Sequence, residues 1–358
     1  MKQIFFTPGP AELYFTVKSH LKKALNEQVP SISHRSAQFQ SIFQEAEENL
    51  RNLLDLPDNY HVFFTGSATE IWERIIQNLV AKRSYHYVNG AFSERFYRIA
   101  QELGRSPIVQ TAPAGECALV DSSKISADTE LIAFTQNETS TGVAHPLKDI
   151  YQVRQSHPNA IVAVDAVSTL PYMPLDYTQI DTAYFSVQKG FGLPAGLGVW
   201  LVNDRCLAKA EQLVKQQSIG SYHSLPSLLA KAQKHQTPET PNVLGIYLLA
   251  KVTGDMLTKG IDVIRNETKF KAGMMYQMLS EHAKFTPFVE KEEHRSKTVI
   301  VAETQNHSSK IIEELGQSQL LIGDGYGTFK GKHIRIANFP THSKEQMILL
   351  IDKMSTIL

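Results

Sequence analysis

The segment YFSVQKGFGLPAG, residues 184–196, decides how the fold of this chain is interpreted. Its first four residues form an apolar run, which is typical of a buried strand. The run ends at Gln188 and Lys189, and glycines then recur at 190, 192, 196 and 198. Lysine is among the residues least often fully buried. Lys189, at the end of a strand, therefore either reaches solvent or binds something.

Similar apolar runs lie on both sides of this segment and alternate with helical patterns. The expected strands are at 61–65, 84–89, 131–135, 160–165, 182–187 and 198–202, and the expected helices are at 69–81, 92–103, 147–156 and 204–217. This alternation predicts an α/β fold with a mostly parallel sheet and helices on both of its faces. The strands are continuously apolar, which indicates burial on both sides.

The rhythm changes at about residue 243, where two long helices are expected. After the helices at 243–258 and 261–283 we expect strands at 297–303 and 332–339 and helices near 308–317 and 343–357. A chain of 358 residues is longer than one hydrophobic core usually supports. We therefore predict a large domain, 16–245, and a smaller α/β domain built from 246–358 together with the N-terminal residues 1–15.

Composition excludes several classes of protein. The chain is 42% hydrophobic and 20% charged, with a formal net charge of zero, so we expect no nucleic-acid partner. We expect neither a signal peptide nor a membrane span, because no apolar run is long enough. Two cysteines, Cys117 and Cys206, form neither a disulfide framework nor a zinc cluster. These features predict a cytoplasmic protein without a metal site.

Three further segments carry groups that could act with Lys189. TGSATEIWER (65–74) follows a strand and opens a helix, and its Ser67, Ala68 and Thr69 are small enough for a phosphate to approach the free N–H groups. Ser67 or Thr69 could equally be an ordinary helix cap. Asp165 ends a strand, at the edge where parallel sheets bind ligands, although it too could be a cap. Phe92 could stack on a planar ligand or belong to the core.

Together these groups suit pyridoxal 5′-phosphate. The lysine amine would form a Schiff base, the internal aldimine, with the cofactor aldehyde. The aspartate would keep a proton on the pyridine nitrogen, so that the ring accepts electrons. The start of the helix would bind the phosphate, and the aromatic ring would cover the cofactor. No other common cofactor needs all four groups.

At this point the chain resembles the class V aminotransferases over nearly its whole length. This resemblance implies fold type I, the fold of aspartate aminotransferase, with a mostly parallel sheet of the seven-stranded type, a smaller C-terminal domain and a homodimer. It implies catalytic roles for Lys189 and Asp165. Six motifs carry it in order: FTPGP (6–10, with Gly9 near the substrate), TGSAT (65–69, phosphate loop), NETSTG (137–142, with Thr139 at the cofactor), VDAVS (164–168, with Asp165 and Ser168), SVQKGF (186–191, with Ser186, Gln188 and Lys189) and GKHIRIANF (331–339, with Arg335 binding the substrate carboxylate).

The resemblance also assigns residues to the partner subunit and to the substrate. HQTPETPNVLGIY (235–247) resembles the segment whose threonine reaches the neighbouring cofactor, with Thr237 and Thr240 as candidates. The spacing of Thr240 to Tyr247 matches the family pattern better. SISHRSAQF (31–39) resembles the phosphoserine aminotransferases, in which a His-Arg pair binds the distal anion, and this implies roles for His34 and Arg35. The same pair could be a surface cap or salt bridge.

The predicted function is a ping-pong transaminase, with phosphoserine or 3-phosphohydroxypyruvate and glutamate or 2-oxoglutarate as substrates. An alanine- or serine-glyoxylate or pyruvate aminotransferase is the alternative, because GDGYGTFKGK (323–332) resembles that branch and Phe92 replaces a tryptophan. A class V lyase such as cysteine desulfurase needs a late nucleophilic cysteine, and none follows Cys206. A non-catalytic binding protein with the same fold is a further alternative.

Overall fold

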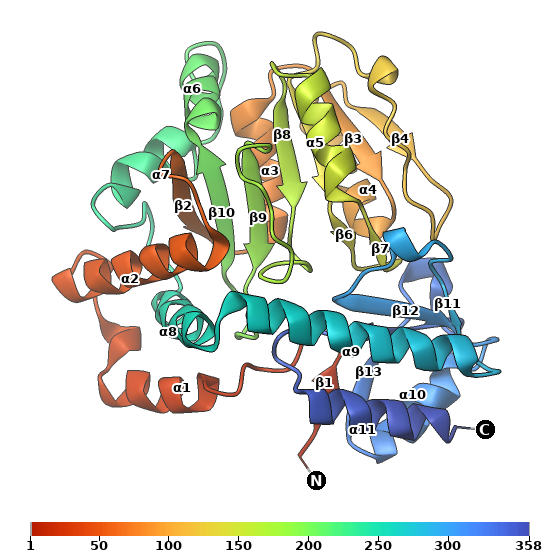
Figure 1. Cartoon of the computed structure of the whole chain (residues 1–358). Helices are drawn as coiled ribbons and strands as arrows, with labels where there is room; N and C mark the ends of the chain where they lie inside the picture. Colours follow the sequence, from red (N-terminus) through yellow and green to blue (C-terminus); the bar gives the residue numbers. More distant parts are fainter. Residues whose placement is uncertain (1, 358) are drawn as a thin grey trace.

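The computed structural model describes residues 2–357 and contains two large sheets connected by long helices, with a further two-stranded sheet of β6 (Asn137–Glu138) and β7 (Val143–Ala144) (Figure 1). The larger sheet has seven strands in the order β2-β10-β9-β8-β5-β3-β4. Its strands are β2 (Tyr60–Thr65), β3 (Ser84–Val88), β4 (Ile108–Thr111), β5 (Leu131–Thr135), β8 (Ile161–Asp165), β9 (Thr182–Ser186) and β10 (Gly198–Asn203). All pairings are parallel except those of β10 with β2 and with β9. The predicted mostly parallel seven-stranded sheet is thus confirmed.

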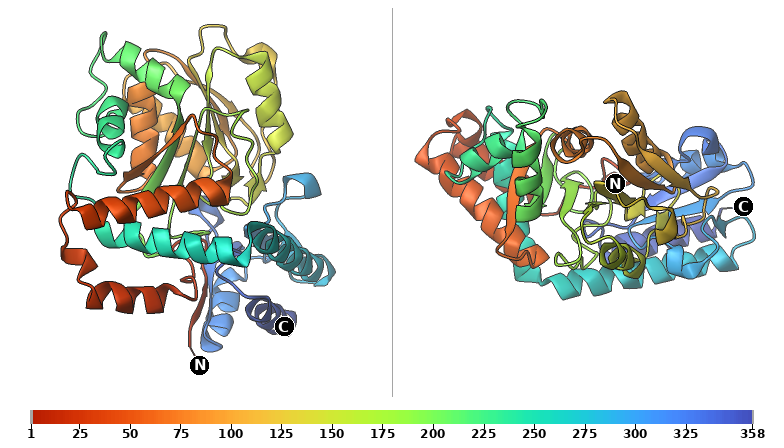
Figure 2. Two further views of the ribbon diagram at one scale, coloured as in Figure 1. Left: turned by 60° about the vertical axis from the view of Figure 1, so that its left-hand side comes forward. Right: turned by 90° about the horizontal axis from the view of Figure 1, so that it is seen from above.

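Helices cover both faces of this sheet, and the strands alternate between two cores. Phe63 and Trp200 point into a core shared with α3 (Ala68–Leu79), α4 (Ala91–Glu102), α6 (Asp204–Leu213) and α7 (Leu225–Ala232). Phe64 and Leu201, one residue further along each strand, point into the core formed with α1 (Val17–Asn26), α2 (Ala37–Leu54), α5 (Leu147–Ser156) and α8 (Val243–Lys259). Each residue step turns a strand's side chains to the other face. Figure 2 shows the sheet between these layers.

Around the larger sheet, sequence patterns missed β4 and the helices α1, α2 and α7. β4 is a four-residue edge strand that is only partly buried, so it has no continuous apolar run to detect. The α1 and α2 segments are amphipathic and pack on α8, which supplies the apolar partner that their own sequence lacks. α6 ends at Leu213, four residues before its expected end, where the chain tightens into turns that return to the Leu213 carbonyl.

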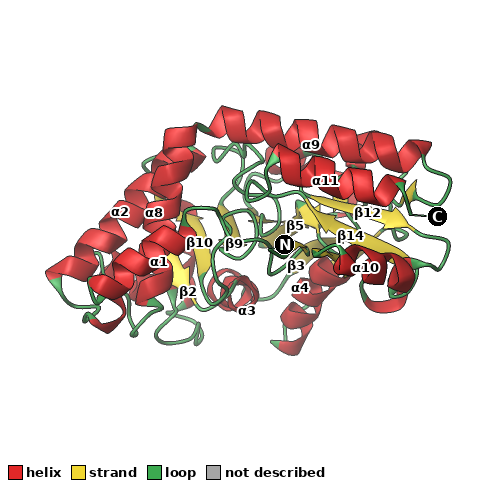
Figure 3. Ribbon diagram, turned by 90° about the horizontal axis from the view of Figure 1, so that it is seen from below, coloured by secondary structure: helices red, strands yellow, loops and turns green. Residues whose placement is uncertain are grey.

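The smaller sheet has the order β1-β13-β14-β12-β11 and includes the N-terminal strand. Its strands are β1 (Ile4–Phe6), β11 (Thr286–Pro287), β12 (Val299–Glu303), β13 (Leu320–Asp324) and β14 (His333–Ala337). One face forms a core with α9 (Ile261–Glu281), α10 (Ser308–Gln317) and α11 (Lys344–Ser355). Figure 3 shows α9 and α11 beside this sheet. The opposite face, with Val299 and Val301, belongs to a separate small cluster.

β1 pairs in parallel with β13, so residues near the start of the chain lie in the smaller sheet. The domain boundaries at 16 and 245 stay a prediction. None of the helices within residues 2–357 is both long and apolar enough to cross a membrane.

Candidate active site

The candidate site lies where the parallel strands of the large sheet end. β8 ends at Asp165, and β9 is followed two residues later by Gln188 and Lys189. These strands are parallel neighbours, so their carboxyl ends meet at the same edge of the sheet. The structure thus brings the two predicted catalytic residues to one edge, as the strand pattern indicates.

Lys189 turns toward the N-terminal segment. Its Nζ donates a hydrogen bond to the carbonyl of Pro8. The next residue, Gly9, has a φ of +152°, and a Cβ there would lie 2.2 Å from Nζ. This φ favours glycine, and a side chain here would also displace the lysine amine. Gly9, predicted at the substrate, therefore lies directly beside Lys189.

The surroundings of Lys189 lower the pKa of its amine. Burial and the nearby guanidinium of Arg335 lower the pKa of Lys189 to about 8, against the opposing charges of Asp165 and Glu138. A lysine amine with this pKa is partly neutral near pH 7, as a nucleophile must be. The four charged groups therefore act on one another within one site.

Asp165 is buried, with 3% of its surface exposed, and both of its carboxylate oxygens are hydrogen-bonded. Trp72 donates from Nε1 to Oδ2 at 3.0 Å, and the Val167 N–H donates to Oδ1 at 2.9 Å. Burial raises the pKa of Asp165 to about 7 in spite of these donors. Sequence analysis missed Trp72, which follows Ala68 by one turn of α3.

The start of α3 is arranged as a typical N-terminus. Ser67 is the N-cap, and its Oγ accepts from the Glu70 N–H at 3.1 Å, which confirms the capping role. The Ala68 N–H donates to Ser186 Oγ at 3.1 Å, so it is already paired. Thr69 is exposed. The backbone of β10 passes closely here, since a Cβ on Gly198 would lie 2.5 Å from the carbonyl carbon of Ser67.

Thr139 and Ser168 form a buried hydroxyl pair at the ends of neighbouring segments. The Thr139 Oγ1 donates to Ser168 Oγ at 2.9 Å, and Ser168 Oγ donates to the Asn137 carbonyl at 2.9 Å. The buried Gln188 Oε1, next to Lys189 in the chain, has no hydrogen-bond partner among the described residues. A buried amide oxygen without a partner is unusual and favours a ligand with a donor at this place.

Arg335 reaches the site from the smaller sheet. It alternates with Ile334 and Ile336, which are buried in the core under α9, so its side chain points to the opposite face. Its Nε donates to the Asp324 carbonyl at 2.7 Å and its Nη1 to the Thr139 carbonyl at 3.4 Å. Within residues 2–357 it forms no ion pair, which leaves donors for an anion.

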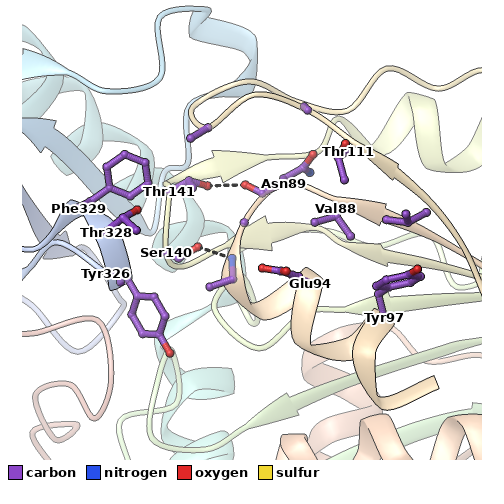
Figure 4. Close-up of a pocket in the computed structure, with 16 residues that line it drawn as sticks. Val88, Asn89, Glu94, Tyr97, Thr111, Ser140, Thr141, Tyr326, Thr328 and Phe329 are labelled. Carbon is purple, nitrogen blue, oxygen red and sulfur yellow. Dashed lines mark hydrogen bonds between the residues drawn. The ribbon is translucent and has the colours of Figure 1, made fainter. Parts of the chain in front are cut away.

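Aromatic rings and a pocket adjoin Arg335. The guanidinium carbon lies 5.3 Å from the centre of the Tyr326 ring, and this ring lies 5.2 Å from that of Phe92. A pocket of about 520 Å³ opens beside them between the two sheets. Figure 4 shows Tyr326 facing Ser140 across this pocket, with Glu94 on α4. Tyr326 was missed because the glycines around it read as a plain turn.

Glu138 was also missed, although it is fully buried beside the site. Its carboxylate accepts from the backbone and hydroxyl of Ser93, at 3.0 and 2.8 Å, and from the backbone and hydroxyl of Ser140, at 3.1 and 2.6 Å. It therefore binds the start of α4 to the NETSTG turn and fixes the position of Phe92. The acid at the N-terminus of a helix is stabilised by the helix dipole.

The remaining predicted residues gather at a different place. Arg35 donates to Gln236 Oε1 and to the Thr237 carbonyl, both at 2.8 Å, and to the Pro238 carbonyl at 3.2 Å. Thr240 Oγ1 lies 3.4 Å from His34 Nδ1. No hydrogen bond or ion pair within residues 2–357 joins these residues to Lys189, Asp165 or Arg335. Burial, followed by the charge of Arg35, lowers the pKa of His34.

Comparison with protein families shows to which family the chain belongs. The model for the class V aminotransferases matches residues 5–336, which contain the whole of the larger sheet and every site residue described above. The chain belongs to the class V aminotransferase family. This establishes the resemblance that the six motifs predicted, and it establishes the chain as a member of an enzyme family of transaminases.

Several solved structures and relatives resemble this class V aminotransferase. The crystal structure of a phosphoserine aminotransferase from Cytophaga hutchinsonii is 49% identical, with 98% of both chains covered and a TM-score of 0.96. A phosphoserine aminotransferase of Rhodococcus opacus is 27% identical, covering 91% of this chain and 87% of its own. An alanine–glyoxylate aminotransferase from a Nostoc species is 19% identical, covers 99% and 95%, and has a TM-score of 0.87. This last similarity supports the fold alone.

The residues of this class V aminotransferase fit a phosphorylated pyridoxal cofactor. Lys189 supplies an amine of lowered pKa, and Asp165 a buried carboxylate for a ring nitrogen. The N-terminus of α3, capped by Ser67, is the kind of helix start that favours a phosphate.

Proposed function

We propose that the protein is a pyridoxal-phosphate-dependent transaminase of the phosphoserine aminotransferase type. The observation that carries this proposal is that the Lys189 amine lies within reach of the charges of a buried carboxylate, Asp165, and a guanidinium, Arg335, that has no acidic partner within residues 2–357. This set offers a nucleophile, a group that holds a proton on a ring nitrogen and a clamp for a carboxylate.

In this proposal the chain holds the cofactor at three places. Ser67, Ala68 and Thr69, with Ser186 and Gln188, would surround the phosphate, and Asp165 would pair with the ring nitrogen. Phe92 would cover the ring, and Thr139 and Ser168 would line its edge. When bound, the cofactor supplies an electron sink for the pair of electrons left when Cα loses its proton.

Each protein group then has a separate task. Arg335 binds the substrate α-carboxylate through its free N–H donors and so turns the single Cα–H bond toward Lys189. The free amine of Lys189 accepts the proton that Cα loses, and later returns a proton. Its pKa of about 8 suits both directions near neutral pH. Trp72 and the Val167 N–H keep the Asp165 carboxylate oriented.

The substrate assignment rests on the relatives and on the His34–Arg35 pair. We propose phosphoserine or 3-phosphohydroxypyruvate with glutamate or 2-oxoglutarate, because the 49% identical structure is that of a phosphoserine aminotransferase. Arg35 packs on the segment 236–240 and Thr240 contacts His34. If Thr240 reaches the partner subunit's cofactor in a homodimer, His34 and Arg35 enter that site with it. The Thr237 hydroxyl donates a hydrogen bond to the Glu239 carbonyl at 2.8 Å. Because this hydroxyl is already engaged, Thr240 is the better candidate for the role.

One feature favours an alanine- or serine-glyoxylate aminotransferase instead. In the turn 323–332, Tyr326 packs against Arg335 and Phe92, and no basic residue within this turn contacts Arg335. An enzyme for small uncharged amino acids needs no further cation there. A cytoplasmic location, expected from the sequence, stays a prediction.

A half-reaction screen tests the proposal. The purified protein, reconstituted with pyridoxal phosphate, should be yellow, and the absorbance should fall when an amino donor is added. Phosphoserine and glutamate should bleach the band at micromolar to millimolar concentration, and alanine should act only weakly. Bleaching by alanine or serine alone would support the second candidate. A protein that binds no cofactor at Lys189 would contradict both.

A further inference from the structure

His223 lies between two carboxylates from segments that are far apart in the chain. It precedes α7, only 3% of its surface is exposed, and its Nδ1 is bonded to Glu70 Oε1. On the other side of the ring, Nε2 lies 3.1 Å from Glu239 Oε2. Glu70 belongs to the first turn of α3, and Glu239 to the segment 236–240. The imidazole therefore connects these two segments directly.

Glu70 links His223 to the loop 66–69, which we propose as the binding site of the cofactor phosphate. Its Oε2 accepts from the Gly66 N–H at 3.0 Å, and its own N–H donates to the N-cap Ser67. Arg74 lies on the outer side, with Nε 3.5 Å from Glu70 Oε1. The conformation of the loop and the position of the imidazole are thus linked through one side chain.

Glu239, on the other side of His223, belongs to the segment that carries Thr237 and Thr240. Arg35 holds this segment from the other direction through the Thr237 and Pro238 carbonyls. A pocket of about 190 Å³ lies between the loop and this segment, lined by Gly66, Glu239 and Thr240 among others. The loop and the segment therefore face each other across a small space, and His223 spans one side of it.

The charges in this cluster require a cation at its centre. Two carboxylates, Glu70 and Glu239, face the ring, and Arg74 is shared with Glu73 and lies over the Tyr222 ring. Burial disfavours the imidazolium, but the close contacts with Glu239 and Glu70 and the charges of these two acids outweigh it and raise the pKa of His223 to about 9. Without this cation the two acids would repel each other, and both would face an incoming phosphate uncompensated.

We propose that His223 is a positioning residue for the cofactor phosphate, because its imidazolium holds the segment 236–240 against the phosphate loop and neutralises the acids beside it. The inference rests on the proposed function, since it assigns the phosphate to this loop. It adds a requirement that the motifs do not contain. Affinity for the phosphate group, and not for the pyridoxal ring, depends on the Glu70–His223–Glu239 cluster.

Comparing two ligands isolates this effect. The dissociation constants of pyridoxal phosphate and of pyridoxal, which lacks the phosphate, are measured on the apoprotein by the absorbance of the bound form. In His223→Gln the constant for pyridoxal phosphate should rise at least about tenfold, while that for pyridoxal stays within about twofold. The double variant His223→Gln/Glu239→Gln should recover part of the loss, because one uncompensated acid is gone.

Two further variants keep the experiment decisive. Glu239→Ala removes a side chain that is 32% exposed, so it should fold, and it should show the same selective loss. His61→Gln is the control, because His61 forms a similar pair with Asp204, at 2.8 Å, away from the loop. Equal weakening of both ligands, or no weakening in either cluster variant, would overturn the inference. Failure of the wild-type protein to bind pyridoxal phosphate would instead overturn the proposed function.

Discussion

The cluster around Lys189 and the segment 236–240 are built in different ways. Asp165 and Lys189 lie at the ends of neighbouring strands of the larger sheet and Arg335 lies within β14 of the smaller sheet, and burial together with nearby charges shifts their pKa values. The segment 236–240 is held at the surface by hydrogen bonds from Arg35 and by contact with His223. The first cluster holds its chemical groups within one chain. The second presents groups that, in the homodimer we propose, would act on the partner subunit's cofactor.

This difference separates chemistry from recognition. Changes in the first cluster should affect every substrate, because they alter the reacting groups. Changes in the segment and its supports should affect only phosphate or distal-anion binding. The predictions below test this separation, in order of decreasing effect.

Replacing Lys189 should have the largest effect. Lys189→Ala removes the nucleophile and the group that moves the Cα proton, so turnover should fall by on the order of 10³–10⁴ or more. Borohydride reduction followed by peptide mapping should attach the cofactor to Lys189 in the wild-type protein and to nothing in the variant. Turnover retained in Lys189→Ala would contradict the assignment of Lys189 as the catalytic lysine.

Lys271 is the matched control for this experiment. It is also buried, its pKa is lowered by burial to about 7, and its Nζ donates to the carbonyls of Phe339 and His342 at 3.1 and 2.6 Å. Lys271→Met should lower the melting temperature and leave labelling of Lys189 intact. Labelling of Lys271 would mean that burial alone, and not position at the sheet edge, selects the reactive lysine.

Asp165→Asn should have the next largest effect. The amide cannot hold a proton on the ring nitrogen by charge, so kcat should fall by on the order of 10²–10³ for every amino donor. The cofactor should still bind, because Lys189 is intact. A loss confined to one donor, measured by kcat/KM, would contradict its place in the common chemistry.

Arg335 and Arg35 should differ in selectivity. Arg335→Ala removes charge-assisted hydrogen bonds worth roughly 3 kcal/mol in total, so kcat/KM should fall about 10²-fold for phosphoserine, glutamate and alanine alike. Arg35→Ala should cost about tenfold for phosphoserine alone and leave alanine unchanged. If Arg35→Ala weakens all three donors equally, Arg35 only supports the segment 236–240 and binds no anion.

The pH dependence of cofactor capture should show the smallest effect. A lysine amine attacks an aldehyde only when neutral, and the pKa of Lys189 is about 8. The rate at which the apoprotein captures pyridoxal phosphate should therefore rise about tenfold from pH 7 to pH 9 and level off above. Arg335→Gln removes a positive neighbour, so the profile should move to higher pH. An unchanged profile would mean that Arg335 does not act on Lys189.

The sequence predicted the central strands well because each carries a continuous apolar run. It missed β4, a short and partly buried edge strand, and it missed α1 and α2, which depend on α8 for their packing. At the site it found residues that belong to motifs. It missed Trp72, Glu138 and His223, whose importance lies in partners 93, 45 and 153 positions away in the chain.

By itself the sequence determined the class V family, the strand-end positions of Lys189 and Asp165 and the order of the motifs. These follow from local patterns, since a strand, its end and the next turn are neighbours in the chain. Only the tertiary structure decided which charges share the site of Lys189 and that His34 and Arg35 support the segment 236–240. Charge coupling depends on distance in space and on burial, and neither is encoded at any single position.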